Sequence, residues 1–131
     1  METLMKRLKL IAGSIIVIIA VSLVVDYLLV EAKDDRVFGA ISRCDGRCAS
    51  IPFWPLGTEY RVTFPRALTS AELKQLDEIN SLRGAVGVAF VDCELSANQV
   101  REAMAKLHNC RLYRIRDGER SVLDDREPEE R

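Results

Sequence analysis

The chain has 131 residues, which is enough for one small domain, and its formal net charge is −1. Because no excess of basic residues surrounds it with a positive field, we expect no nucleic-acid partner. Its four cysteines are too few to act as a disulfide scaffold.

The N-terminal part of the chain has the pattern of a membrane anchor. Residues 1–9 carry Lys6, Arg7 and Lys9 against a single acid, and residues 10–30 are almost entirely apolar. At about 1.5 Å per residue such a run spans roughly 30 Å, the thickness of a bilayer's hydrocarbon core. The sequence therefore predicts a single-pass transmembrane helix in the lipid bilayer. The basic flank predicts a cytoplasmic N-terminus and an extracytoplasmic C-terminal domain.

Two features of this segment allow alternatives. The small residues around Glu31 also suit a cleaved signal peptide, although the apolar region of such peptides is normally only about 7–15 residues long. Asp26 lies near the outer end of the run. It is expected to reach the interface or, alternatively, to pair with a basic residue of a membrane partner.

Residues 31–58 are predicted to be an irregular linker or cap that contains Cys44 and Cys48. Asp45-Gly46 favours a tight turn between the two cysteines, so a local disulfide is expected outside the cytoplasm. The alternatives are a redox-active thiol pair or a zinc site completed by one of Cys93, His108 and Cys110. Cys93 and Cys110 are otherwise expected to pack as small buried apolar residues.

Two helix starts carry the same signal further along the chain. Thr69 with Glu72 and Ser96 with Gln99 each form a capping box, and the second box follows the first by 27 residues. Strands are predicted at 60–64, 86–91 and 111–116. Their inward-facing pairs are expected to be Val62/Phe64, Val88/Phe90 and Tyr113/Ile115. A strand that follows each helix requires parallel pairing.

The central unit has small or apolar residues at Ala85, Val88, Phe90, Cys93 and Leu95. This spacing resembles one turn of a leucine-rich repeat of the ribonuclease-inhibitor-like kind, and the resemblance covers residues 60–117. It implies an α/β fold in which the transmembrane helix is followed by a minimal βαβαβ unit with parallel strands, at residues 59–117. The alternative is a generic three-stranded α/β sheet.

The resemblance also implies where a partner would bind. Leucine-rich-repeat proteins usually bind proteins with the strand side, and the residues expected on that side are Arg61, Thr63, Ala89, Val91, Arg114 and Arg116. Alternatively, Phe53 and Trp54 fold over this face as a cap. Residues 118–131 are predicted to be a charged, disordered tail.

Nothing in the sequence indicates catalysis. His108 is the single histidine, no nucleophile is paired with it, and no nucleotide-, metal- or cofactor-binding motif is present. The prediction is therefore a membrane-anchored protein–protein interaction module that is not an enzyme and needs no cofactor or metal. Such a module would act as an envelope adaptor or small subunit of a complex with a protein partner that the sequence does not name. The alternative is a thiol-redox or metal-binding envelope module that uses Cys44 and Cys48.

Overall fold

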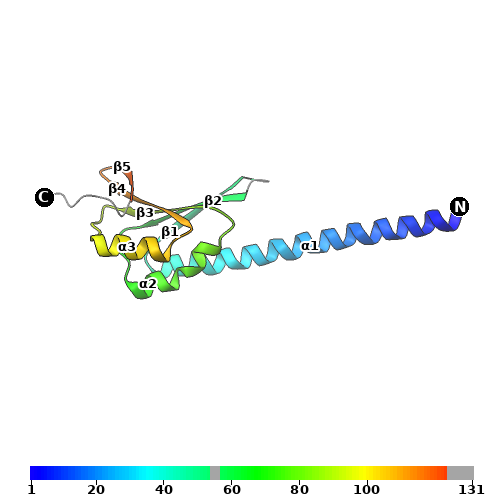
Figure 1. The fold of residues 1–131 in the computed structure, drawn as a ribbon, viewed down its shortest axis with the longest axis horizontal. Helices are drawn as coiled ribbons and strands as arrows, with labels where there is room; N and C mark the ends of the chain where they lie inside the picture. The colour runs from blue at the N-terminus through cyan, green and yellow to red at the C-terminus, as the bar shows by residue number, and fades with distance from the viewer. Residues whose placement is uncertain (54–56, 124–131) are drawn as a thin grey trace. The chain divides into compact units, whose positions relative to one another are not determined.

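A computed structural model of the chain describes residues 1–53 and 57–123. The chain divides into two compact units, Met1–Asp34 and Asp35–Arg131, and helix α1 (Glu2–Arg43) contributes to both. The fold is mixed α/β: a long apolar helix begins the chain, and a five-stranded mixed sheet forms the body of the second unit (Figure 1).

The first unit consists of the N-terminal part of α1. The large apolar side chains between Leu10 and Leu29 are exposed, so this stretch buries no core of its own. Among the described helices, α1 alone is long and apolar enough to cross a membrane. A signal sequence would meet the same criterion.

The second unit begins with helix where the sequence predicted an irregular linker. Helix α1 continues to Arg43 because Val37, Ala40 and Ile41 recur at helical spacing and are buried. Strand β1 (Arg47–Phe53) then occupies seven of the fifteen remaining residues of the predicted linker. The prediction of irregular structure over 31–58 was therefore wrong for residues 31–43, which are helical, and for residues 47–53, which form a strand. Residues 54–56 lie outside the described residues.

The sheet has the strand order β1-β2-β3-β4-β5. Strands β2 (Gly57–Phe64), β3 (Gly84–Val91) and β4 (Cys110–Arg116) are parallel neighbours. β1 pairs antiparallel with β2 at one edge, and β5 (Glu119–Val122) pairs antiparallel with β4 at the other. The three predicted strands and their parallel pairing are confirmed, within a larger mixed sheet.

Short helices connect the parallel strands. Helix α2 (Ser70–Gln75) and the 3₁₀ helix η1 (Asp77–Ser81) join β2 to β3, and α3 (Ala97–Lys106) joins β3 to β4. Both predicted capping boxes are present. Thr69 N–H donates to the Glu72 carboxylate at 2.9 Å, and Ser96 N–H donates to Gln99 Oε1 at 2.9 Å.

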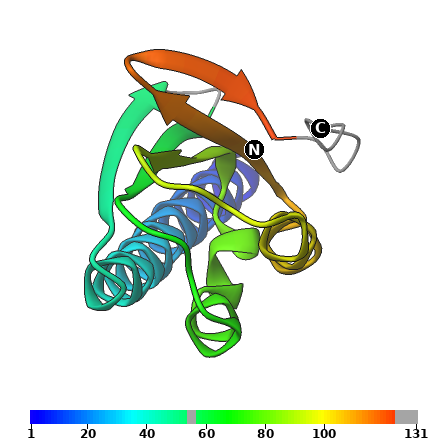
Figure 2. The same ribbon diagram turned by 90° about the vertical axis from the view of Figure 1, so that its left-hand side faces the viewer.

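The helices of the second unit lie on one face of the sheet (Figure 2). Alternate residues of β2 and β3 point into the resulting core, which explains why Tyr60, Val62 and Phe64 are almost fully buried. Val88 and Phe90 match them on β3, and the rings of Phe64 and Phe90 stack at 5.9 Å. The helices contribute Leu73, Leu76, Ile79, Val100, Ala103 and Leu107.

β4, the third of the predicted strands, buries the opposite set of alternating side chains from the one predicted. Leu112 pairs with Val88 and is buried, whereas Tyr113 and Ile115 are only partly buried and lie on the other face. Because β4 has apolar residues in both alternating positions, its pattern alone does not select a face. The pairing with β3 decides which side is buried.

The predicted disordered tail contains a strand. Asp117 and Gly118 both have positive φ angles, 51° and 80°, as a two-residue hairpin turn requires, and β5 follows. Leu123 is buried and its N–H donates to Leu112 O at 3.0 Å. The tail prediction was therefore wrong for residues 119–123, and residues 124–131 lie outside the described part of the chain.

Candidate functional site

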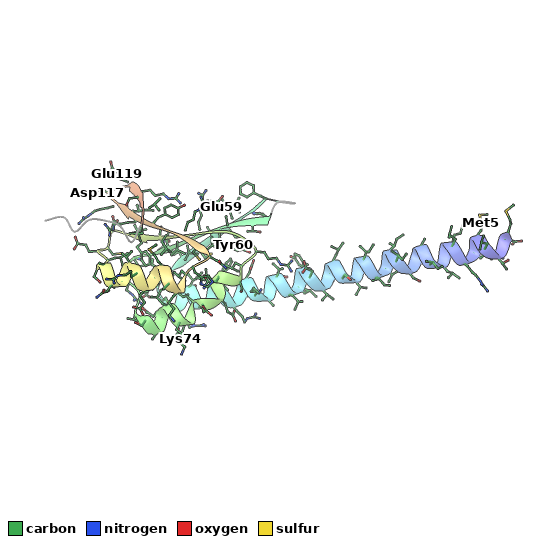
Figure 3. The ribbon with its side chains drawn as sticks, in the orientation of Figure 1. Met5, Glu59, Tyr60, Lys74, Asp117 and Glu119 are labelled. Carbon is green, nitrogen blue, oxygen red and sulfur yellow. The ribbon has the colours of Figure 1, made fainter. Side chains whose placement is uncertain are left out.

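The face of the sheet opposite the helices has no helix on it in the described part of the chain, and we call it the bare face. In Figure 3 Glu59 lies on this side, whereas Lys74 projects from α2 on the helical side. The strand pairing and the hollow described below assign the following residues to the bare face: Arg47, Ala49, Ile51, Phe53, Glu59, Arg61, Thr63, Ala85, Gly87, Ala89, Val91, Arg111, Tyr113, Ile115, Arg120 and Val122.

The bare face is hollowed along its central strand. β3 presents Ala85, Gly87 and Ala89 to this face, whereas its neighbours β2 and β4 present larger side chains. The difference in side-chain size leaves a trough, which we define as the hollow of about 550 Å³ over β3. Its volume lies within the range of about 300–1,000 Å³ that is usual for ligand sites.

Arginines dominate the charge of the bare face. The charged residues assigned to this face are four arginines and one acid, which gives a net charge of +3: Arg47, Arg61, Arg111, Arg120 and Glu59. Two of these arginines are held in place. Arg61 Nε donates to Glu59 Oε1 at 2.8 Å, and the Arg120 guanidinium stacks 3.5 Å above the centre of the Tyr113 ring.

Exposed apolar side chains lie at both edges of the bare face. Phe53 on β1 is 51% exposed, and Val122 on β5 is 67% exposed. Trp54, the other residue of the predicted cap, lies outside the described residues. Phe53 is not among the described residues that line the trough, so its side chain does not cover the central strand.

The structure separates the residues predicted to bind a partner. Arg61, Thr63 and Ala89 line the trough, and Val91 lies on the same face near Thr63. Arg114 and Arg116 lie on the opposite face, where Arg116 Nη2 donates to Glu94 Oε1 at 2.9 Å. The inverted facing of β4 is the cause.

The facing of β4, opposite to the predicted one, also places on the bare face several residues that the sequence analysis did not assign to the binding surface. Arg111, Tyr113, Ile115 and Arg120 contribute to the trough. The Asp117-Gly118 turn was the available signal for β5, and with it for Arg120.

None of the four cysteines is joined in a disulfide in the structure, so the expected disulfide between Cys44 and Cys48 is not formed there. Burial raises the pKa of Cys44, which packs in the core. Burial also raises the pKa of Cys110 to about 11. A raised pKa keeps the Cys44 thiol protonated and poorly nucleophilic. No group of three metal-ligating side chains occurs among the described residues.

Two further candidate residues lie elsewhere. Asp26, the candidate for pairing within a membrane, is exposed on α1 within the first unit. His108 follows α3 and is exposed. Neither contributes to the trough.

Comparison with protein-family models, with curated proteins and with solved structures found no match for this chain. The structure defines the chain as a mixed α/β fold with an apolar N-terminal helix and a sheet with one face that no helix covers within residues 1–53 and 57–123.

Proposed function

We propose that the chain is a membrane-anchored protein-binding module, without catalytic activity, whose contact surface is the bare face. It would act as an envelope adaptor or small subunit of a larger complex. The single observation that carries this proposal is the sheet with helices on one face and, on the other, a trough over the central strand that is lined by arginines. Concave surfaces that combine apolar groups with a few convergent polar side chains are the usual location of binding sites.

The anchor is proposed to be the N-terminal part of α1. Its exposed apolar side chains gain a favourable environment only in lipid or against another apolar surface. Lys6, Arg7 and Lys9 at its start favour a cytoplasmic N-terminus, which would place the sheet on the extracytoplasmic side.

The repeat resemblance supports the choice of surface. Parallel strands on one side and helices on the other are the arrangement of leucine-rich repeats, which bind partners with their strands. We propose that residues 60–117 are a short repeat of this kind, closed at each edge by the antiparallel strands β1 and β5.

Site-specific photo-crosslinking of the full chain in cells tests the proposal. A photoreactive residue at Thr63 on the bare face should form protein adducts, whereas the same residue at Lys106, exposed on α3, should form few. Equal adduct yields from both positions, or none from Thr63, would refute the bare face as the contact surface.

A further inference from the structure

The trough has the shape of a site for an extended chain. Its floor is made by the smallest side chains of the sheet, and its length follows β3 from Ala85 to Ala89. Gly87 is central to it, because a Cβ there would meet Tyr113 Cε2 at 3.4 Å and occupy part of the space. A segment lying along β3 would place its side chains against Tyr113 and Ile115.

The walls of the trough fix the charge of such a segment. Arg61 lies on the β2 side, and Arg111 and Arg120 lie on the β4 and β5 side. The described lining of the trough thus has three arginines and one acid, Glu59. The Glu59 carboxylate already accepts a hydrogen bond from Arg61, so the trough keeps a net positive charge. Guanidinium groups bind carboxylates through paired, charge-assisted hydrogen bonds, which makes acidic side chains the complementary ligands.

We infer that the trough binds an extended, acidic segment of a partner protein that also carries apolar side chains. This inference rests on the proposed function and names the chemistry of its partner. A protein segment fits better than a nucleic acid for two reasons. The trough floor is apolar rather than a stacking platform of several aromatic rings, and the chain as a whole has a net charge of −1.

Peptide binding to the full chain in phosphatidylcholine nanodiscs tests this inference. The probes are three fluorescein-labelled peptides in which Leu alternates with Glu, Gln or Lys, together with a labelled oligothymidine, all followed by fluorescence anisotropy. The Glu/Leu peptide should bind at least about tenfold more tightly than the Gln/Leu peptide, and added salt should weaken it.

Matched arginine variants locate the site. Arg61→Gln and Arg111→Gln should each weaken binding of the Glu/Leu peptide about fivefold or more. Arg101→Gln serves as the control, because Arg101 is exposed on α3 and its Nη2 donates to Asn98 Oδ1 at 2.8 Å. Gly87→Val, which fills the trough without changing its charge, should also weaken binding.

Four results would overturn the inference. These are equal binding of the Glu/Leu and Gln/Leu peptides, an equal loss in Arg101→Gln, tighter binding of oligothymidine, and binding that appears only after residues 124–131 are removed. The last result would assign the trough to the chain's own acid-rich segment. If the peptide test fails while Thr63 still forms protein adducts in cells, only the acidic specificity is lost. Loss of the adducts themselves would remove the proposed function.

Discussion

The guanidinium of Arg66 binds both oxygens of the Glu72 carboxylate, with Nη2 2.6 Å from Oε1 and Nη1 2.9 Å from Oε2. The same carboxylate accepts the N–H of Thr69 and so completes the cap of α2. Arg66 also donates to Asp45 in the turn between α1 and β1, at 3.1 Å. One side chain therefore connects the end of β2, the start of α2 and the turn before β1.

This cluster predicts a specific acid sensitivity. The Arg66 guanidinium and the Thr69 N–H lower the pKa of Glu72 from its ordinary 4.5 to about 2. The pKa of Glu72 is lower in the folded state than in the unfolded state, so ionised Glu72 stabilises the fold. This contribution is complete above about pH 4.5 and is lost as the pH falls towards 2. Glu72→Gln should lower the free energy of unfolding at pH 7 by about 1 kcal/mol and flatten its decline between these pH values.

Urea unfolding of the full chain in micelles, followed by circular dichroism from pH 7 to pH 2, measures this effect. Glu78→Gln is the control, because Glu78 contacts Arg36 at 3.4 Å with both side chains more than half exposed. Such a pair contributes little. The interpretation fails if both variants show the same pH dependence.

The facing of β4 predicts unequal costs for two neighbouring truncations. Leu112→Ala removes a buried side chain from the core and should cost about 2–5 kcal/mol. Ile115→Ala truncates a partly buried side chain that lines the trough, and it should cost roughly 1 kcal/mol. Denaturant unfolding of the two variants measures the difference, and a larger cost for Ile115→Ala would restore the facing first expected from the sequence.

The sequence was most informative where local signals were unambiguous. The capping residues Thr69 and Ser96 located both helix starts, and the strict alternation Tyr60-Arg-Val-Thr-Phe64 fixed the facing of β2. It was least informative where the pattern allowed two solutions. Charged residues between Glu31 and Arg36 obscured the continuation of α1, whose buried stripe is short.

The candidate site was predicted only in part for the same physical reason. Arg61, Thr63 and Ala89 were placed correctly because their strands alternate clearly. The arginines of β4 and β5 were not, because facing there depends on pairing between strands rather than on local composition.

Two glycines should differ sharply in their tolerance of alanine. A Cβ at Gly84, whose φ is +138°, would lie 1.7 Å from Thr58 O, so the neighbouring strand would have to move. Gly118 has a φ of +80° but nothing within 4 Å. Gly84→Ala should therefore cost more than about 2 kcal/mol, and Gly118→Ala about 1 kcal/mol. Similar unfolding midpoints for the two variants would contradict the close approach of β2 and β3.

Asn80 connects η1 to the end of α3. Its Nδ2 donates to Lys106 O at 2.7 Å, and its Oδ1 accepts the N–H of Asn109 at 3.2 Å. Asn80→Ala should lower the free energy of unfolding by about 1–2 kcal/mol. Asn98→Ala is the control, since Asn98 is exposed on α3 and its Oδ1 accepts a hydrogen bond from Arg101 of the same helix. Equal losses in the two variants would show that the connection contributes nothing.

The most direct test of the central claim is cysteine labelling of intact cells with a membrane-impermeant maleimide. Val122→Cys reports on the bare face and Lys106→Cys on the helical side, each compared with the parent chain. A membrane-anchored domain that binds protein with its bare face predicts that Lys106→Cys labels in intact cells. Val122→Cys should label strongly only after detergent and high salt disrupt the complex. Labelling of neither variant before lysis, or equal labelling of both throughout, would contradict the account.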